Sequence, residues 1–246
     1  MPIEIYLLVF GIAMAYSSVG HGGASGYLAI LALFGFMPNE MVSSALVLNL
    51  LVAGTAFVAY WKNGHFSFRL FWPFALASVP CAFIGGLIKA PYPIYYWLFA
   101  SVLVFASFRL AFAGKENVRD KPFRIPSLAL ALPVGAGIGF LSGMVGVGGG
   151  IFLSPLMLLF HWANAKQTAA ASAAFIWVNS IAGLYGHMSR QGLHVLELWP
   201  VVFAAFLGGL MGSSLGAKYL STPALKRVLA GVLLIAAFKM LRMTSG

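Results

Sequence analysis

The chain has 246 residues, of which 61% are hydrophobic and only 8% are charged, and its mean hydropathy is +0.93. A soluble domain keeps roughly 25% of its residues charged to face water, so this composition excludes a water-soluble fold. The formal net charge of +10 is spread between long apolar runs, which favours basic cytoplasmic loops over a nucleic-acid surface. We therefore expect an all-α, polytopic bundle of transmembrane helices in a lipid bilayer, with no nucleic acid as a partner.

The first apolar region, residues 3–36, is broken in its middle by glycine. It is too long for one straight crossing, which takes ~20 residues, and too short for two. The break reads Ser17-Ser18-Val19-Gly20-His21-Gly22-Gly23-Ala24-Ser25-Gly26. No basic segment precedes this region, so we expect no cleaved signal peptide and a first membrane segment that is retained.

Three full spans follow, at about 42–61, 70–89 and 93–113, and a polar connector occupies residues 114–125. The single cysteine, Cys81, lies inside an apolar run. One cysteine gives no disulfide framework and no thiolate metal site. We expect no metal and no cofactor.

The second apolar region, residues 126–162, repeats the pattern of the first. Its break reads Ser142-Gly143-Met144-Val145-Gly146-Val147-Gly148-Gly149-Gly150, and three further spans follow at about 168–188, 195–217 and 223–243. The glycine clusters of the two breaks align at one constant offset of 126 residues. An ordered match of this kind indicates duplication. We expect a first repeat at 1–113, the connector at 114–125, and a second repeat at 126–246.

The basic residues bear on the orientation of the repeats. If each broken region crosses the membrane zero times or twice, eleven of the 15 Lys and Arg fall on one side. The positive-inside rule then predicts inverted repeats, with both termini in the periplasm of a bacterial inner membrane. Each repeat would contain a Gly-broken helix or a pair of half-helices, plus three full spans.

The two glycine breaks predict an anion site. An apolar helix restarts after each break, near Ala24 and near Ile151. Helix starts offer unpaired N–H groups and a positive dipole end, and glycine lets a ligand approach the backbone closely. Inverted repeats would bring both helix starts toward one central point. Close helix packing is the alternative explanation for the glycines, and it suits the scattered ones, such as Gly85 and Gly208.

Polar residues near the breaks complete the expected site. Asn49 and Asn179 recur in the two repeats inside apolar helices, where an amide either lines a cavity or bonds a neighbouring helix. Serines near the breaks either donate to an oxyanion or bond their own helix. The candidate substrate-binding residues are Ser18, Gly20, His21, Gly22, Gly23, Ser25, Asn49, Ser142, Gly146, Gly148, Gly149, Gly150 and Asn179.

Titratable groups narrow the class of substrate. No carboxylate lies in the middle of an expected span, which disfavours a cation pump because such relays use Asp and Glu. His21 lies within the first glycine cluster, where three roles are open: binding the anion when protonated, coupling transport to protons, or bonding the backbone. We expect a small anion as the substrate, with protons as a candidate coupling ion and an oligomeric state that the sequence does not define.

The run Leu141-Ser142-Gly143-Met144-Val145-Gly146-Val147-Gly148-Gly149-Gly150-Ile151-Phe152-Leu153-Ser154-Pro155-Leu156 resembles the TauE/SafE family of sulfite exporters. That family has a Gly-rich stretch running into a short helix with a proline, repeated in weaker form near the N-terminus. The resemblance covers the length, the two halves and both glycine clusters. It implies a secondary transporter, not an enzyme, that exports sulfite or a related sulfur-containing or organic anion.

A second interpretation is an intramembrane serine protease. Gly23-Ala24-Ser25-Gly26 fits the Gly-x-Ser-Gly pattern of rhomboid-like enzymes, with Ser25 as the nucleophile and His187 as its base. The second repeat has Ile151 opposite Ser25, so the pattern is not duplicated. We therefore rank this interpretation below anion transport.

Overall fold

The computed structural model describes residues 3–34, 38–88, 126–191 and 199–221, together with single residues at 104, 108 and between 223 and 238. Within these residues all regular structure is helical. The helices are α1 (Ile3–Ser17), α2 (Ala24–Leu33), α3 (Pro38–Lys62), α4 (Phe68–Leu87), α6 (Leu128–Val145), α7 (Gly150–Leu159), α8 (Ala165–Gln191), α9 (Trp199–Ser214) and the π-helical turn η1 (Leu215–Tyr219).

Four of the five described helices that are long and apolar enough to cross a membrane lie where the hydropathy predicts a full span, and the fifth, α6, lies in the second broken region. The five are α3, α4, α6, α8, and α9 continued by η1, which confirms the polytopic all-α fold. Helices α3, α4 and α8 overlap the spans expected at 42–61, 70–89 and 168–188. Helix α9 together with η1 covers most of the span expected at 195–217. The spans expected at 93–113 and 223–243 and the connector 114–125 lie outside the described residues, apart from single positions.

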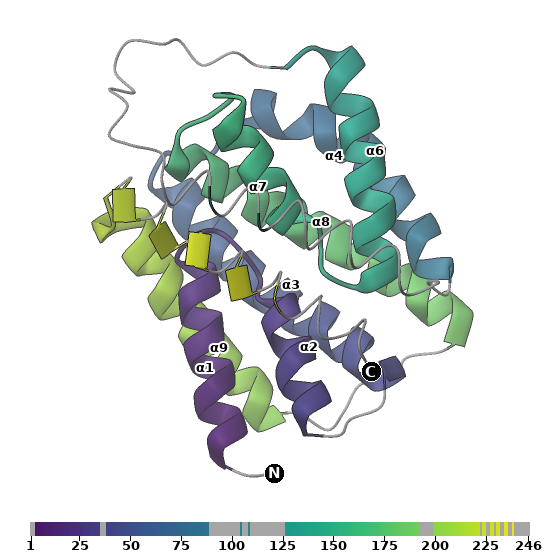
Figure 1. Ribbon diagram of the computed structural model, residues 1–246, viewed down its shortest axis with the longest axis vertical. Coiled ribbons are helices and arrows are strands. Elements are labelled where there is room, and N and C mark those ends of the chain that lie inside the picture. Colours follow the sequence, from purple (N-terminus) through teal and green to yellow (C-terminus); the bar gives the residue numbers. More distant parts are fainter. Residues whose placement is uncertain are drawn as a thin grey trace.

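Each glycine break separates two helices, as predicted. The helix after the first break begins at Ala24, and the helix after the second begins at Gly150. Both of these helices, α2 and α7, have ten residues and are therefore about 15 Å long, half of a hydrocarbon core of about 30 Å. Figure 1 shows the pairs α1/α2 and α6/α7 entering from opposite ends of the molecule and turning near its middle.

Glycines bring the outer helices into close, parallel packing. A Cβ added at Gly208 of α9 would overlap the carbonyl of Phe10 in α1, and one at Gly212 would overlap that of Met14. In the same way, Gly135 and Gly143 of α6 lie on the carbonyls of Phe74 and Ala82 in α4. In both pairs the contacts advance in the same direction along the two chains. The scattered glycines therefore serve packing, as small residues do at membrane helix interfaces.

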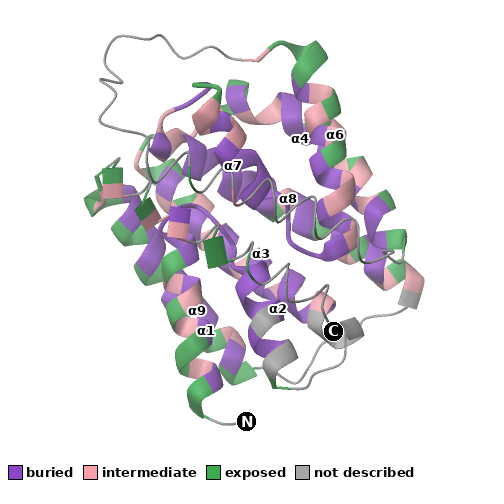
Figure 2. Ribbon diagram, in the orientation of Figure 1, coloured by how far each residue is buried: buried purple, intermediate pink, exposed green. Residues whose placement is uncertain are grey.

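The longest helices, α3 and α8, form the centre of the bundle. They pack against each other, α8 also packs against α4, and α3 against α9. The apolar window of α8 is 72% buried, against 39–50% for the other four spans. Figure 2 shows the same arrangement, with buried residues concentrated along α2, α3, α7 and α8 and exposed ones on the outer helices. The half-helices α2 and α7 therefore begin in the most enclosed part of the described structure.

Candidate functional site

The second break is a tight backbone turn that depends on glycine. Gly146, Gly148 and Gly149 have φ angles of 77°, 76° and 80°, in the left-handed region that side chains with a Cβ avoid. Helix α7 then starts with Phe152 and Leu153 donating to the Gly149 carbonyl. Within the described residues the N–H groups of Gly150 and Ile151 make no hydrogen bond to another backbone group. The first turn of α7 thus presents free donors.

The first break has the same design. Gly20 and Gly23 have φ angles of 77° and 90°, and Tyr27 donates its N–H to the Gly23 carbonyl at 3.0 Å as α2 begins. One N–H group of this first turn has a side-chain partner: Ala24 donates to Oδ1 of Asn49 at 3.0 Å. The start of α2 is therefore held by an amide from α3.

Asn49 joins the two breaks. While its Oδ1 accepts from Ala24, its Nδ2 donates to the Val147 carbonyl in the second break at 3.3 Å. The same Nδ2 lies 3.4 Å from Oγ of Ser180 on α8. Asn49 is fully buried. A Cβ added at Gly22 would overlap its amide, and one at Gly148 would lie 3.0 Å from its Nδ2. The two glycine clusters thus lie side by side, as the sequence predicts.

His21 makes the second link between the halves. Its Nε2 lies 3.2 Å from Oγ of Ser154 on α7, which in turn lies 2.6 Å from Oγ of Ser172 on α8. Its Nδ1 lies 3.1 Å from the Val19 carbonyl, and the ring also contacts the backbone of Gly150. A side chain from the first break therefore reaches the first turn of the second half-helix.

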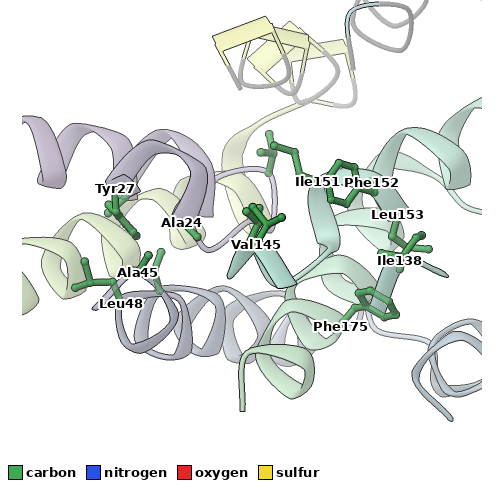
Figure 3. Packing of buried hydrophobic residues seen from close by; sticks show 14 of the residues in the cluster. Ala24, Tyr27, Ala45, Leu48, Ile138, Val145, Ile151, Phe152, Leu153 and Phe175 are labelled. Atoms are coloured by element: carbon green, nitrogen blue, oxygen red, sulfur yellow. The ribbon is translucent and has the colours of Figure 1, made fainter. Parts of the chain in front are cut away.

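The surroundings of the two breaks are enclosed and carry no fixed charge. In the described part of the chain, the buried polar residues other than tyrosine are Ser, Thr, Asn and His, with no Lys, Arg, Asp or Glu among them. Apolar side chains close the region, with Ala24 and Tyr27 on one side of Val145 and Ile151 and Phe152 on the other in Figure 3. Two positive helix ends meet here without a counter-charge.

Two tyrosines belong to this site, and the sequence analysis missed both. The Tyr16 hydroxyl lies 3.0 Å from Oγ of Ser25. The Tyr27 hydroxyl is buried without a hydrogen-bond partner, and a Cβ on Gly23 would come within 2.8 Å of it. Tyr27 lies at i+4 from Gly23, so the start of α2 carries its own donor. That spacing was visible in the sequence, but a tyrosine in an apolar run is ordinarily interpreted as a residue that packs against neighbouring helices.

Some candidates have different neighbours. Ser18 donates its hydroxyl to the Ala15 carbonyl, and its own carbonyl accepts from Tyr60 of α3 and lies against Gly216 of η1. Ser142 donates to the Gly139 carbonyl yet lies beside Gly149. Asn179 accepts from Ser78 of α4 at 2.8 Å, and its Nδ2 is buried without a partner. Asn49 and Asn179 therefore have unlike partners despite their matching positions.

The remaining glycine candidates fill tight backbone positions around the same two breaks. A Cβ on Gly20 would overlap the carbonyl of Ala169, and one on Gly146 would lie 2.6 Å from Cγ1 of Val42. Gly150 has the same relation to Ile176 on α8, with 2.5 Å to Cδ1. Close packing thus accounts for these three glycines as well as backbone access does.

The structure gives no support to a serine–histidine pair. Ser25 bonds Tyr16, whereas His187 lies 3.0 Å from the Gly143 carbonyl through Nε2 and 3.3 Å from Nη2 of Arg190 through Nδ1. Both nitrogens of His187 are thus engaged away from Ser25. A general base must lie within hydrogen-bond reach of its nucleophile.

Comparison with known proteins agrees with the membrane architecture. The family model described as Sulfite exporter TauE/SafE matches residues 5–240. The probable membrane transporter protein y4hK of Sinorhizobium fredii is 36% identical over 243 residues, which cover 97% of this chain and 98% of that protein. The probable membrane transporter protein YjnA of Bacillus subtilis is 20% identical and covers 98% of this chain and 100% of its own length. No solved structure matches the chain.

Proposed function

Because this chain belongs to the TauE/SafE family of sulfite exporters, we propose that this membrane transporter carries a small anion outward across a bacterial inner membrane. Sulfite, or a related sulfur-containing or organic anion, is the proposed substrate. The transport is secondary and needs no cofactor. Export of an anion has a driving force of its own, since the membrane potential contributes about 2.3 kcal/mol per charge per 100 mV.

One observation carries this proposal: the starts of α2 and α7 meet in the interior and are tied to each other by Asn49. Each helix start carries roughly half a positive charge, so the two together attract one small anion. The N–H groups of Gly150 and Ile151 and the hydroxyl of Tyr27 are the donors proposed to bind it. No buried Lys or Arg is needed for this chemistry.

The proposed cycle is alternating access around this point. In inverted repeats the binding site lies near the midplane, and one part of the bundle rocks against the other.

The proposed orientation places both termini in the periplasm. It is supported by Lys166 and His65, which both bond the Ala217 carbonyl and so gather basic groups at one end. This orientation places Lys62 on the cytoplasmic side. A Lys62→Cys protein in a Cys81→Ser background should therefore not react with membrane-impermeant maleimides in intact cells. Labelling of this cysteine would show that the opposite orientation is correct.

The substrate class is tested with purified protein in detergent and in proteoliposomes. We expect sulfite to raise the midpoint of thermal unfolding in a saturable manner, because a ligand at 100 times its Kd adds about 2.7 kcal/mol of stability. Sulfate, thiosulfate, sulfoacetate and simple carboxylates form the comparison set. Saturable sulfite flux in proteoliposomes is the matching functional result. Absence of any anion-specific stabilisation and of saturable flux would refute the proposed function.

Replacing Tyr27 by Phe is expected to weaken sulfite binding about tenfold or more, because a hydrogen bond to a charged group contributes about 1.5–3 kcal/mol. The thermal stability of the ligand-free protein should not fall, since this hydroxyl has no partner to lose and is buried at a cost. Isothermal titration gives the affinity. The matched control is Tyr185→Phe, at a side chain that is 64% exposed. Equal affinities in the wild type and the Tyr27→Phe protein would exclude this hydroxyl from the site.

We propose His21 as the group that couples a proton to the anion, because it lies in the first break and contacts α7 through Ser154 and the backbone of Gly150. Sulfite flux is measured in proteoliposomes with one pH gradient that is acidic inside and one that is alkaline inside. The wild type should give different fluxes in these two gradients. The two fluxes should become equal for His21→Asn. A gradient response that survives the substitution would assign the coupling to another group or to none.

A further inference from the structure

A groove outside the proposed transport site lies between α3 and the α9–η1 segment. It has a volume of about 640 Å³, within the range of about 300–1,000 Å³ that is typical of small-molecule pockets. Its walls come from both helices. Among the residues that line it are Val58, Lys62, Phe206, Leu210 and Lys218.

This groove faces away from the two glycine breaks. Val58 follows Asn49 by nine residues, about two and a half helical turns, so the two side chains leave α3 on opposite sides. The side chains of Val58, Phe206 and Leu210 are 42%, 37% and 41% exposed. On a membrane helix, such exposed apolar side chains face acyl chains. The groove is therefore a site on the lipid-facing surface, separate from the anion site.

One end of the groove is basic. Lys62 and Lys218 both line it and are both exposed. In the described part of the chain the acidic residues are Glu4 and Glu40, and Glu40 begins the same helix that Lys62 ends, about 33 Å away at 1.5 Å per residue. Glu4 lies six residues before Phe10, whose carbonyl meets Gly208 of α9, so it is at the end of α1 away from Lys218. Among the described residues, neither carboxylate therefore lies near the two lysines.

Three of the other polar side chains in the groove donate to nearby backbone carbonyls: Thr55 to Val52, Asn63 to Ala59 and Ser213 to Leu210. Ser214 adds one exposed hydroxyl. The two ammonium groups are the charged donors that the groove offers to an anionic ligand. Further along the groove, toward the starts of the two helices, Val58, Phe206 and Leu210 form an apolar slot.

We propose that the groove binds one anionic phospholipid, with its phosphate between Lys62 and Lys218 and an acyl chain along the apolar slot. Basic pockets between transmembrane helices hold the head groups of anionic lipids in this way. The apolar slot is the reason for choosing a lipid over a free phosphate ion. The site requires both features in one molecule: a single negative charge at the membrane surface and a hydrocarbon chain that follows the helix axis.

The test is native mass spectrometry of delipidated protein titrated with dioleoylphosphatidylglycerol and dioleoylphosphatidylcholine. We expect the wild type to prefer the anionic lipid at least tenfold. Lys62→Gln and Lys218→Gln should each lower its affinity about fivefold, since a basic residue near an anionic lipid surface contributes about that factor. Arg69→Gln is the matched control, because Arg69 is exposed near the start of α4 and does not line the groove.

Two further binding measurements distinguish a bound phospholipid from a free anion. Dihexanoylphosphatidylglycerol should bind more weakly than the dioleoyl form, and 10 mM inorganic phosphate should not displace the long-chain lipid. Equal binding of both chain lengths, or displacement by phosphate, would show a simple anion site and overturn the proposal. Loss of sulfite flux in the Lys62→Gln protein in vesicles of phosphatidylcholine alone would instead make the groove a vestibule for the substrate, and would overturn it too.

Discussion

An Asn49→Asp protein is expected to fold and to lose sulfite binding at neutral pH by about 100-fold or more. The carboxylate would still accept from the N–H group of Ala24, so the start of α2 keeps its partner. Its negative charge, however, would lie between the two helix starts, where it takes the place of the substrate's charge. Unfavourable juxtaposition of like charges costs several kcal/mol, which sets the size of the loss.

The same variant offers an internal check by pH. Protonation of the introduced carboxyl removes its charge and supplies an O–H donor, which can replace the donation of Asn49 to the Val147 carbonyl. Sulfite binding should therefore recover as the pH falls. Asn63→Asp makes the same chemical change just after the end of α3, outside the breaks, and should leave sulfite affinity unaltered. Wild-type affinity in the Asn49→Asp protein at neutral pH would mean that no anion binds at the breaks.

A Gly149→Val protein is expected to bind no sulfite while remaining folded enough to purify. Gly149 has a φ of 80°, a region costly for a β-branched side chain. Its Cβ would lie 2.9 Å from both Cγ2 of Ile138 and Cε1 of Phe175. The turn would have to move, and with it the free N–H groups of Gly150 and Ile151. Titration calorimetry with sulfite and thermal unfolding in detergent measure the two effects separately.

Gly137→Val is the control for this substitution. It introduces the same side chain into α6, but an added Cβ there meets no atom within 4 Å, and the glycine has an ordinary helical conformation. Its sulfite affinity should equal that of the wild type. Retained affinity in Gly149→Val would rule out a binding role for the second helix start, whatever the protein's stability.

The sequence predicted the backbone of the candidate site better than its side-chain contacts. The clusters at Gly20–Gly23 and Gly146–Gly150 are poor helix interiors, since each glycine costs about 1 kcal/mol relative to alanine. The helix breaks therefore follow from local chemistry, and the restarts at Ala24 and Gly150 confirm them. The closeness of the two breaks was expected from the proposed duplication, combined with the cost of irregular backbone in lipid.

The tertiary contacts were beyond sequence reasoning. Asn49 was a candidate because amides in apolar helices need partners, but its link to Val147 spans 98 residues and depends on how α3 meets the second break. Tyr27 and Ser180 gave no signal apart from being polar groups in apolar runs. Asn179 aligned with Asn49, yet its partner is Ser78 on α4, because the neighbours of equivalent helices differ in side chain.

The pairing of helices between the two halves of the chain has a mechanical consequence. In the described structure α9 packs against α1 and α3, and α4 packs against α6 and α8, so the fourth helices have changed places between the halves. Any two rigid bodies that rock would then be α1–α2–α3–α9 and α4–α6–α7–α8, joined mainly along α3 and α8. Of the chain segments that join these two bodies, the described one is the turn at residues 63–67, where Gly64 has a φ of 73° and open space around it; this turn would act as a hinge.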